Sequence, residues 1–234
     1  MSILKVTNID TGYGKKQVLY DVSLEVQKGE SLLIVGSNGS GKSTLLKVIY
    51  GLLDVWQGKV EFEGFLLHDK NKKADTHKLL DKGIMYVPQK DALFDDMSVE
   101  ENIQSSLLHL KDSREIKKRT NQVLDEMTDL QKRKGQLAGK LSGGERKLLS
   151  LAMVSANRPR LLLYDEPLAG VSEENVPMVM HWLKEVQKED CTMVIVEHRV
   201  RELMDFADNI IGLKLGHLYT EKLKTLDNIK KNMV

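Results

Sequence analysis

Short apolar runs recur along this chain, and four of them have the length of a single strand. They are continuously apolar and contain many branched side chains: residues 32–35, 84–87, 161–164 and 193–196. Short apolar runs bounded by polar segments are typical of strands that are buried on both faces. Segments with helical patterns lie between them. This order predicts an α/β core with a mostly parallel sheet.

A second pattern predicts a small antiparallel β subdomain beside this core. Apolar and polar residues alternate at residues 22–26 and again at 59–63. Alternation of this period is typical of strands with one buried face. Residues 3–7 predict another strand, which we expect to be followed by a turn at residues 11–14. Near the end of the chain, residues 210–219 predict a hairpin.

The middle of the chain has a different composition and predicts helices. Ser98 and Glu101 have the spacing of a capping box, in which each side chain satisfies a backbone N–H at a helix start. From there to about residue 156 the sequence is strongly charged and offers no strand candidate. We therefore expect a single domain over residues 1–234. Its core comprises residues 1–90 and 157–234, and its inserted helical subdomain comprises residues 91–156.

Charge and composition narrow the classes of function. The chain has 35 basic and 34 acidic residues, a formal net charge of +1, so its charge balance gives no reason to expect a nucleic-acid partner. No apolar run approaches the length of a membrane span, and no signal pattern begins the chain. Cys191 is the single cysteine, which excludes an internal disulfide and suits a reducing compartment. We expect a cytoplasmic protein whose membrane role, if it has one, comes through a partner.

The clearest candidate for chemistry directly follows the first of the four apolar runs. It fits the pattern G-x-x-x-x-G-K-[ST] and consists of Gly36, Ser37, Asn38, Gly39, Ser40, Gly41, Lys42, Ser43 and Thr44. A strand, this loop and a helix in that order direct backbone N–H groups and a helix N-terminus at one phosphate-binding position. We expect Lys42 to reach the β- and γ-phosphates and the Ser43 hydroxyl to bind Mg²⁺. The sequence therefore predicts a phosphate-loop NTPase core.

Two acidic residues end the strand predicted at residues 161–164. Asp165 is expected to bind Mg²⁺, directly or through water, opposite Ser43. Glu166 is positioned to polarise the attacking water as a general base, a role typically worth ~10²–10⁴-fold in rate. An acid at the end of an isolated strand more often simply begins a turn. It is the phosphate loop elsewhere in the chain that favours the catalytic interpretation.

A third segment predicts a second phosphate-binding surface. Ser142 and Glu145 have capping-box spacing, so a helix start explains part of the pattern. The cap does not explain Gly143 and Gly144, since each glycine inside a helix costs roughly 1 kcal/mol. Two glycines at this position remove side chains from the helix N-terminus and leave its N–H groups open to an anion. The segment is therefore a candidate surface for a γ-phosphate.

Taken together and in this order, the phosphate loop, residues 141–145, residues 161–166 and His198 resemble the ATP-binding cassette (ABC) family of transport ATPases. The resemblance covers essentially the whole chain, and the sequence Leu-Ser-Gly-Gly-Glu is its most specific part. It implies ATP hydrolysis with Mg²⁺ in a dimer of two cassettes paired head-to-tail, either a homodimer or a pair with a paralogue. Ser142, Gly143 and Gly144 of one cassette would then close over ATP on the phosphate loop of the other.

The resemblance also implies roles for single residues. Tyr13 lies where an aromatic ring stacks on adenine, and Gln89 resembles the glutamine that senses Mg²⁺ and the attacking water, next to the surface that docks on an integral membrane permease. His198 resembles the histidine that contacts the γ-phosphate. Residues 168–172 resemble the loop that links the paired sites, although many cassettes have Asp where Ser172 stands.

Two stretches resemble one branch of the family, the ATPase subunits of branched-chain amino-acid importers. They are residues 87–102, with Val-Pro-Gln at one end and Ser-Val-Glu-Glu-Asn at the other, and residues 166–171. Part of this match is shared with other importers and with lipopolysaccharide exporters, so these alternatives stay open. A soluble ATP-gated clamp and a non-hydrolysing regulatory protein are further alternatives. The importer would act at the inner face of the cell membrane with permease subunits and, indirectly, a solute-binding protein.

Overall fold

The computed structural model describes residues 2–90 and 92–219. Its strands are β1 (Ser2–Tyr13), β2 (Lys16–Gln27), β3 (Ser31–Val35), β4 (Gln57–Phe62), β5 (Phe65–Asp69), β6 (Ile84–Val87), β7 (Leu161–Asp165), β8 (Thr192–Glu197), β9 (Asn209–Lys214) and β10 (His217–Tyr219). Its α-helices are α1 (Lys42–Tyr50), α2 (Val99–Ser106), α3 (Ser113–Glu126), α4 (Thr128–Gln131), α5 (Gly143–Asn157), α6 (Val176–Lys188) and α7 (Val200–Leu203). Short 3₁₀ turns are η1 (Thr76–Lys78), η2 (Leu108–Leu110), η3 (Ala138–Lys140) and η4 (Glu173–Asn175).

The central sheet has six strands in the order β10-β9-β3-β8-β7-β6. The pairs from β9 to β6 are parallel, whereas β10 pairs with β9 as an antiparallel hairpin. The four apolar runs form β3, β6, β7 and β8, as predicted. Because parallel strands end at a common edge, the residues that follow β3, β7 and β8 come together at one side of the sheet.

A separate four-stranded antiparallel sheet has the order β2-β1-β4-β5. It confirms the predicted antiparallel part, but two details differ from expectation. The turn expected at residues 11–14 lies later, because β1 continues to Tyr13 and pairs with Lys16. Strand β5 follows a tight turn after β4 and was not predicted from the sequence.

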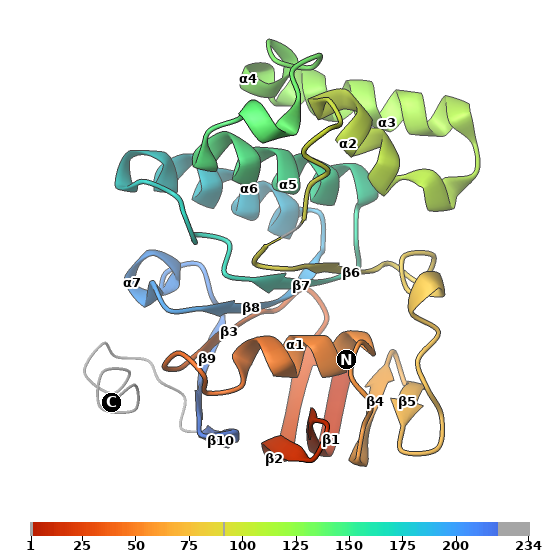
Figure 1. Cartoon of the computed structure of the whole chain (residues 1–234), viewed down its shortest axis with the longest axis vertical. Helices are drawn as coiled ribbons and strands as arrows, with labels where there is room; N and C mark the ends of the chain where they lie inside the picture. The colour runs from red at the N-terminus through yellow and green to blue at the C-terminus, as the bar shows by residue number, and fades with distance from the viewer. Residues whose placement is uncertain (1, 91, 220–234) are drawn as a thin grey trace.

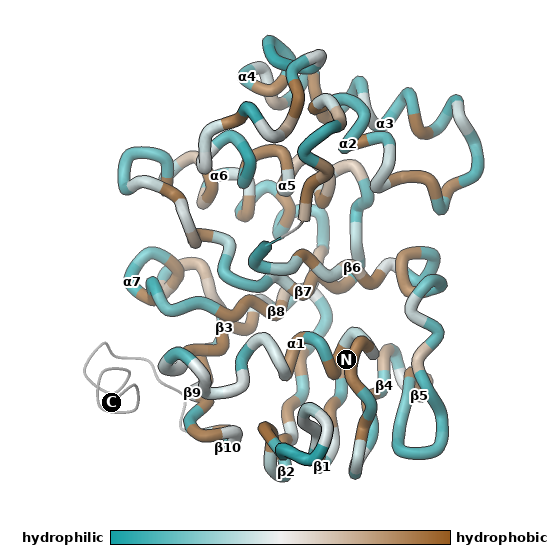
Figure 2. Tube along the Cα trace, viewed as in Figure 1, coloured by the Kyte–Doolittle hydropathy of each residue, from teal (hydrophilic) through white to brown (hydrophobic). Residues whose placement is uncertain are grey.

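The six-stranded sheet separates two hydrophobic layers (Figure 1). Figure 1 shows α2 to α6 on one side of this sheet, and α1 with the antiparallel sheet on the other. Alternate residues of β3 enter the two layers: Leu33 and Val35 pack with the helices α2 to α6, whereas Leu32 and Ile34 pack with α1 and β1. Figure 2 shows the corresponding hydrophobic colour along the central strands. Burial of both faces explains why these strands are continuously apolar.

Helices α2 to α5 lie between β6 and β7 in the sequence. The Ser98 hydroxyl accepts the Glu101 N–H at 3.2 Å, and the Glu101 carboxylate accepts the Ser98 N–H at 2.8 Å, so the predicted capping box is confirmed. Helix α6 has Pro177 in its first turn, where the missing N–H breaks no helical hydrogen bond. Within residues 2–90 and 92–219, no helix has the length and apolar character needed to cross a membrane.

Candidate nucleotide-binding site

The predicted phosphate loop connects β3 to α1 and has the backbone shape that its glycines suggest. Gly41 caps α1 in a left-handed conformation with φ 107°. A Cβ atom at Gly36 would lie 2.3 Å from the Leu213 carbonyl oxygen, so only glycine fits there. The side of the loop at Gly39 is different: a Cβ there would meet no atom within 4 Å. The loop is therefore packed closely against Leu213 at Gly36, whereas its surface at Gly39 is open.

Lys42 lies across this loop with its side chain 5% exposed. Its ammonium group donates hydrogen bonds to the carbonyl oxygens of Gly36 at 2.8 Å and Ser37 at 3.0 Å. Burial lowers the pKa of Lys42, and the nearby carboxylates, that of Glu166 first among them, act in the opposite direction. A buried ammonium beside a glycine-rich loop at a helix N-terminus suits the charge of a nucleotide's phosphates. The Ser40 hydroxyl in the same loop is buried and has no hydrogen-bond partner in the described part of the chain.

The oxygens expected to bind Mg²⁺ lie together. The Ser43 hydroxyl donates to Oδ1 of Asp165 at 3.0 Å, and Asp165 is 3% exposed. Burial raises the pKa of Asp165, the Ser43 hydrogen bond lowers it, and the Glu166 charge raises it. Among the described residues no group of three His, Cys, Asp or Glu side chains could hold a metal. A hydroxyl and one carboxylate are nevertheless the oxygen ligands that suit Mg²⁺ when substrate phosphates supply others, so the residues fit this ion.

Glu166 lies at the centre of the expected catalytic group. It directly follows β7, is 8% exposed and has a left-handed backbone with φ 51°. The Gln89 side-chain amide donates to one carboxylate oxygen of Glu166, and Nδ1 of His198 lies 3.7 Å from the other. A positive φ at a residue with a Cβ costs on the order of 1–3 kcal/mol and is typical of functional sites. The structure thus brings Gln89, Glu166 and His198 together.

Glu197 belongs to this group, although no motif in the sequence predicts a role for it. It ends β8, is fully buried, and one carboxylate oxygen accepts the Leu168 N–H at 3.0 Å. The other oxygen accepts the His198 N–H at 2.8 Å and lies 3.1 Å from Nδ1 of the same residue. Glu197 therefore connects the expected phosphate-sensing histidine to the loop that begins at Leu168. An acid at the end of a fully buried strand was the available sequence signal.

Most of the expected site residues line one cavity of 580 Å³. Its walls include Tyr13, Val18, Asn38, Gly39, Gly41, Lys42, Ser43, Thr44, Gln89, Glu166 and His198. Tyr13 is 47% exposed at one side of this cavity, where a base could stack on its ring. Gly36 and Ser40 support the cavity from behind the loop. A nucleoside triphosphate would extend from Tyr13 across the loop to Glu166.

Ser142, Gly143 and Gly144 lie elsewhere, at the start of α5. The Ser142 hydroxyl accepts the Glu145 N–H at 3.3 Å. Ser142 also lines a hollow together with residues such as Arg133 and Asn175. Because the hydroxyl oxygen accepts in this cap, its own hydrogen stays free to donate. None of the three lines the phosphate-loop cavity, although Gly143 lines another hollow together with Gln89. This separation is what a site completed by a second cassette requires.

The two glycines also have a packing reason that the sequence alone does not predict. A Cβ at Gly143 would lie 2.5 Å from the Gly170 carbonyl oxygen, and one at Gly144 would lie 3.1 Å from the Asn175 side chain. The N-terminus of α5 is thus packed closely against the segment that follows Glu166.

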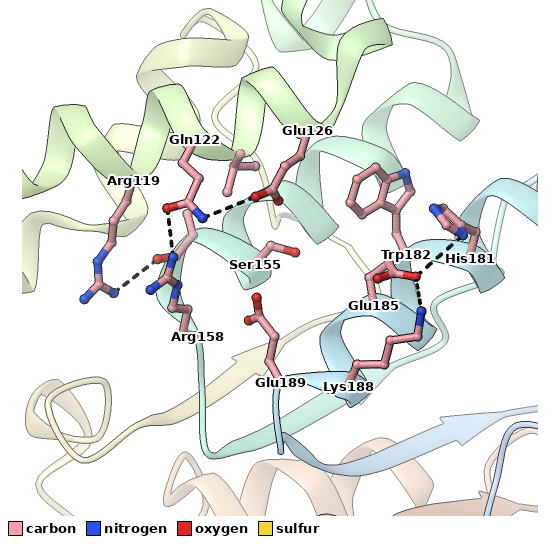
Figure 3. Close-up of a pocket in the computed structure, with 12 residues that line it drawn as sticks. Arg119, Gln122, Glu126, Ser155, Arg158, His181, Trp182, Glu185, Lys188 and Glu189 are labelled. Carbon is pink, nitrogen blue, oxygen red and sulfur yellow. Dashed lines mark hydrogen bonds and ion pairs between the residues drawn. The ribbon is translucent and has the colours of Figure 1, made fainter.

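A different hollow, of 530 Å³, lies between α3, α5 and α6 (Figure 3). No predicted site residue lines it. Polar and charged side chains of this hollow pair with one another: Arg158 donates to the Gln122 side chain at 2.8 Å, and Lys188 lies 2.7 Å from Glu185. The phosphate-loop cavity, with its open donors and clustered carboxylates, is therefore the better candidate for chemistry.

These features define a phosphate-loop ATPase, and comparison with known proteins identifies its family. The model of the ABC transporter family matches residues 19–169. The chain belongs to this family, and it is an ATPase subunit of the ABC transporter type.

Similar proteins include ATP-binding subunits for different solutes. The probable branched-chain amino acid transport ATP-binding protein LivF of Archaeoglobus fulgidus is 32% identical, over 92% of this chain and 90% of the relative. A probable sulfate/thiosulfate import ATP-binding protein of Chlorella vulgaris, CysA, is 37% identical over 93% and 89%. Among solved structures, a nucleotide-free ATP-binding cassette from an ABC transporter has a TM-score of 0.83 at 29% identity, covering 99% of this chain and 95% of that one.

Proposed function

We propose that this chain is the ATPase of an importer of branched-chain or other amino acids. The observation that carries the proposal is similarity along nearly the whole chain to two such subunits. LivF of Archaeoglobus fulgidus is 32% identical, and BraG of Pseudomonas aeruginosa, a high-affinity branched-chain amino acid transport ATP-binding protein, is 31% identical. A sulfate/thiosulfate import protein at 37% and the lipopolysaccharide export protein LptB of Haemophilus influenzae at 30% supply the alternative solutes.

In the proposed reaction ATP lies on the phosphate loop with Tyr13 against its adenine. Lys42 leaves the carbonyl oxygens that it now contacts and binds the β- and γ-phosphates. Mg²⁺, held by Ser43 and Asp165 with Gln89 beside it, would neutralise phosphate charge. Glu166 accepts a proton from the attacking water, while Gln89 and His198 position that water and the γ-phosphate.

The site is complete only when a second cassette contributes Ser142, Gly143 and Gly144. The N–H groups of Gly143 and Gly144 and the free Ser142 hydroxyl hydrogen would donate to the γ-phosphate bound by the other subunit. ATP then drives closure because these contacts exist only in the closed dimer. We infer two equivalent composite sites in a homodimer, or a related pair with a paralogue.

We further propose that closure acts on an integral membrane permease at the inner face of the cell membrane. The docking surface surrounds Gln89 and Phe94, and the Phe94 side chain is 57% exposed. This surface lies where the proposed core, residues 1–90 and 157–234, meets the proposed helical subdomain, residues 91–156. A solved relative, cbiO1 from Clostridium perfringens, is described as part of the ABC transporter complex cbiONQ.

Measuring the uptake of labelled solutes by the cells that produce this protein tests which solute it helps to transport. The chromosomal variant Lys42→Ala removes the phosphate-binding ammonium, and Lys184→Ala, an exposed residue of α6, is the matched control. We expect Lys42→Ala to abolish high-affinity uptake of labelled leucine, isoleucine or another amino acid, with labelled sulfate uptake unchanged. Loss of sulfate uptake alone, or unchanged uptake of every amino acid, would refute the amino-acid assignment.

A further inference from the structure

Lys147 connects two parts of the site that the proposed mechanism treats separately. It lies on α5, five residues after Ser142, and its ammonium group donates to the backbone carbonyl oxygen of Glu166 at 3.0 Å. One end of α5 thus carries the residues expected to contact the partner's ATP. About one turn further along, the same helix holds the backbone of this chain's expected general base.

The carbonyl that Lys147 contacts belongs to a constrained peptide. Glu166 has φ 51°, its N–H donates to the Val196 carbonyl at 2.9 Å, and its carbonyl also accepts the Ala169 N–H at 3.1 Å. The side chain is held by Gln89. Such a conformation persists only where the surroundings hold it in place. Lys147 adds a charged donor to these backbone contacts of Glu166.

The charges around Lys147 also favour a role for its ammonium group in holding Glu166. Burial lowers the pKa of Lys147, whereas the carboxylates of Glu197, Glu166 and Asp165 raise it. The ammonium group also lies 5.8 Å from the centre of the Tyr164 ring, so it is enclosed on the side of β7. A cation among three carboxylates offsets their mutual repulsion.

We propose that Lys147 is a positioning residue for ATP hydrolysis, which holds the backbone of Glu166 and couples its placement to the phosphate-contacting end of α5. The inference rests on the proposed role of Glu166. Movement of α5 on binding the partner's ATP shifts Lys147, and with it the carboxylate that acts on this chain's own ATP. Lys147 itself does not touch the reacting atoms.

The test compares steady-state ATP turnover of Lys147→Met, which keeps the length of the side chain, with that of the exposed control Lys184→Met. Loss of one charge-assisted hydrogen bond predicts a fall in kcat of about 10- to 100-fold. KM for ATP is expected to change by less than about twofold, because the phosphate loop is untouched. An unchanged kcat, or a loss of kcat matched by a loss of folded protein in thermal unfolding, would overturn the inference.

Combining the variant with Glu166→Gln separates positioning from general damage. If Lys147 acts through Glu166, adding Lys147→Met to Glu166→Gln leaves the small residual turnover unchanged. A further loss of about 10-fold or more in the double variant would show that Lys147 acts independently and would refute the proposal. If Glu166→Gln alone retains full turnover, the assigned role of Glu166 fails first. If it is inactive while Lys147→Met is fully active, only the inference about Lys147 fails.

Discussion

Replacing Glu197 by glutamine should destabilise the fold measurably, although the two side chains have nearly the same shape. Both carboxylate oxygens of Glu197 accept backbone N–H groups: one accepts that of Leu168 at 3.0 Å, and the other accepts those of His198 at 2.8 Å and Arg199 at 3.1 Å. An amide has only one acceptor oxygen. In Glu197→Gln its NH₂ group must therefore face at least one backbone N–H, donor against donor.

The magnitude follows from the burial of these groups. Glu197 and Leu168 are both fully buried, so water cannot replace the lost acceptor. A buried donor left without a partner costs about 1–3 kcal/mol, and the lost bond is charge-assisted, which favours the upper part of that range. For a chain of 150–250 residues, each 1 kcal/mol lowers Tm by about 2–4 °C. A loss of about 2–3 kcal/mol therefore predicts a Tm lower by about 4–12 °C.

Thermal unfolding followed by circular dichroism is the assay, with urea unfolding as a second measure of the free energy of unfolding. Glu173→Gln is the matched control, because it removes the same charge from an exposed residue of η4. Its effect should stay within about 0.5 kcal/mol. Equal Tm values for the two variants would refute the assigned role of Glu197 in holding Leu168 and His198.

Two further predictions concern packing and pH. Gly143→Ala brings a Cβ to 2.5 Å from the Gly170 carbonyl oxygen and should lower the free energy of unfolding by about 1–3 kcal/mol. The control Gly135→Ala, whose Cβ would meet no atom within 4 Å, should leave it unchanged. Equal urea midpoints for the two variants would contradict this account. Burial raises the pKa of Cys191 to about 12 from 9.0, so the folded state keeps a proton that the unfolded state loses. The stability that Cys191 contributes is present below pH 9.0 and is lost as pH rises towards 12, with a slope of up to about 1.4 kcal/mol per pH unit. Unfolding free energies measured from pH 8 to 10.5 should therefore fall less steeply in Cys191→Ala, and parallel curves would contradict the assignment.

The central sheet was predictable because its strands are buried on both faces. Continuous apolar runs as short as those of β3 and β7 are typical of such strands, and the acids or loops that follow them necessarily meet at one edge. Capping boxes at Ser98 and Ser142 are local devices, so their residues were sufficient to predict two helix starts.

Strand β5 was missed because no local pattern marks it. Phe65, its first residue, is 75% exposed, while Leu67 and His68 are consecutive buried residues, so apolar and polar positions do not alternate. Its pairing with β4 determines its structure. The turn near Tyr13 was placed too early for a related reason: cross-strand pairs with β2 extend β1 through Gly12, which sequence alone marks as a turn residue.

The candidate site likewise has parts that the sequence predicts and parts that it does not. The phosphate loop and the pair Asp165 and Glu166 are contiguous motifs, and each implies its chemistry from residue types and spacing. The contributions of Glu197 and Lys147 depend on contacts between distant residues, Glu197 with Leu168 and Lys147 with Glu166. Only the packing of α5 against the end of β7 brings Lys147 to the site, and no spacing in the sequence predicts that contact.

The central claim is that two chains close over ATP, each completing the other's site. Light scattering of Glu166→Gln, with and without ATP and Mg²⁺, tests it most directly, because this variant should bind ATP without turning it over. We expect the mass to double from 26.5 kDa on addition of ATP, and the same variant carrying Lys42→Ala to stay monomeric. A Glu166→Gln chain that binds ATP and keeps a mass of 26.5 kDa would contradict the composite site in a homodimer.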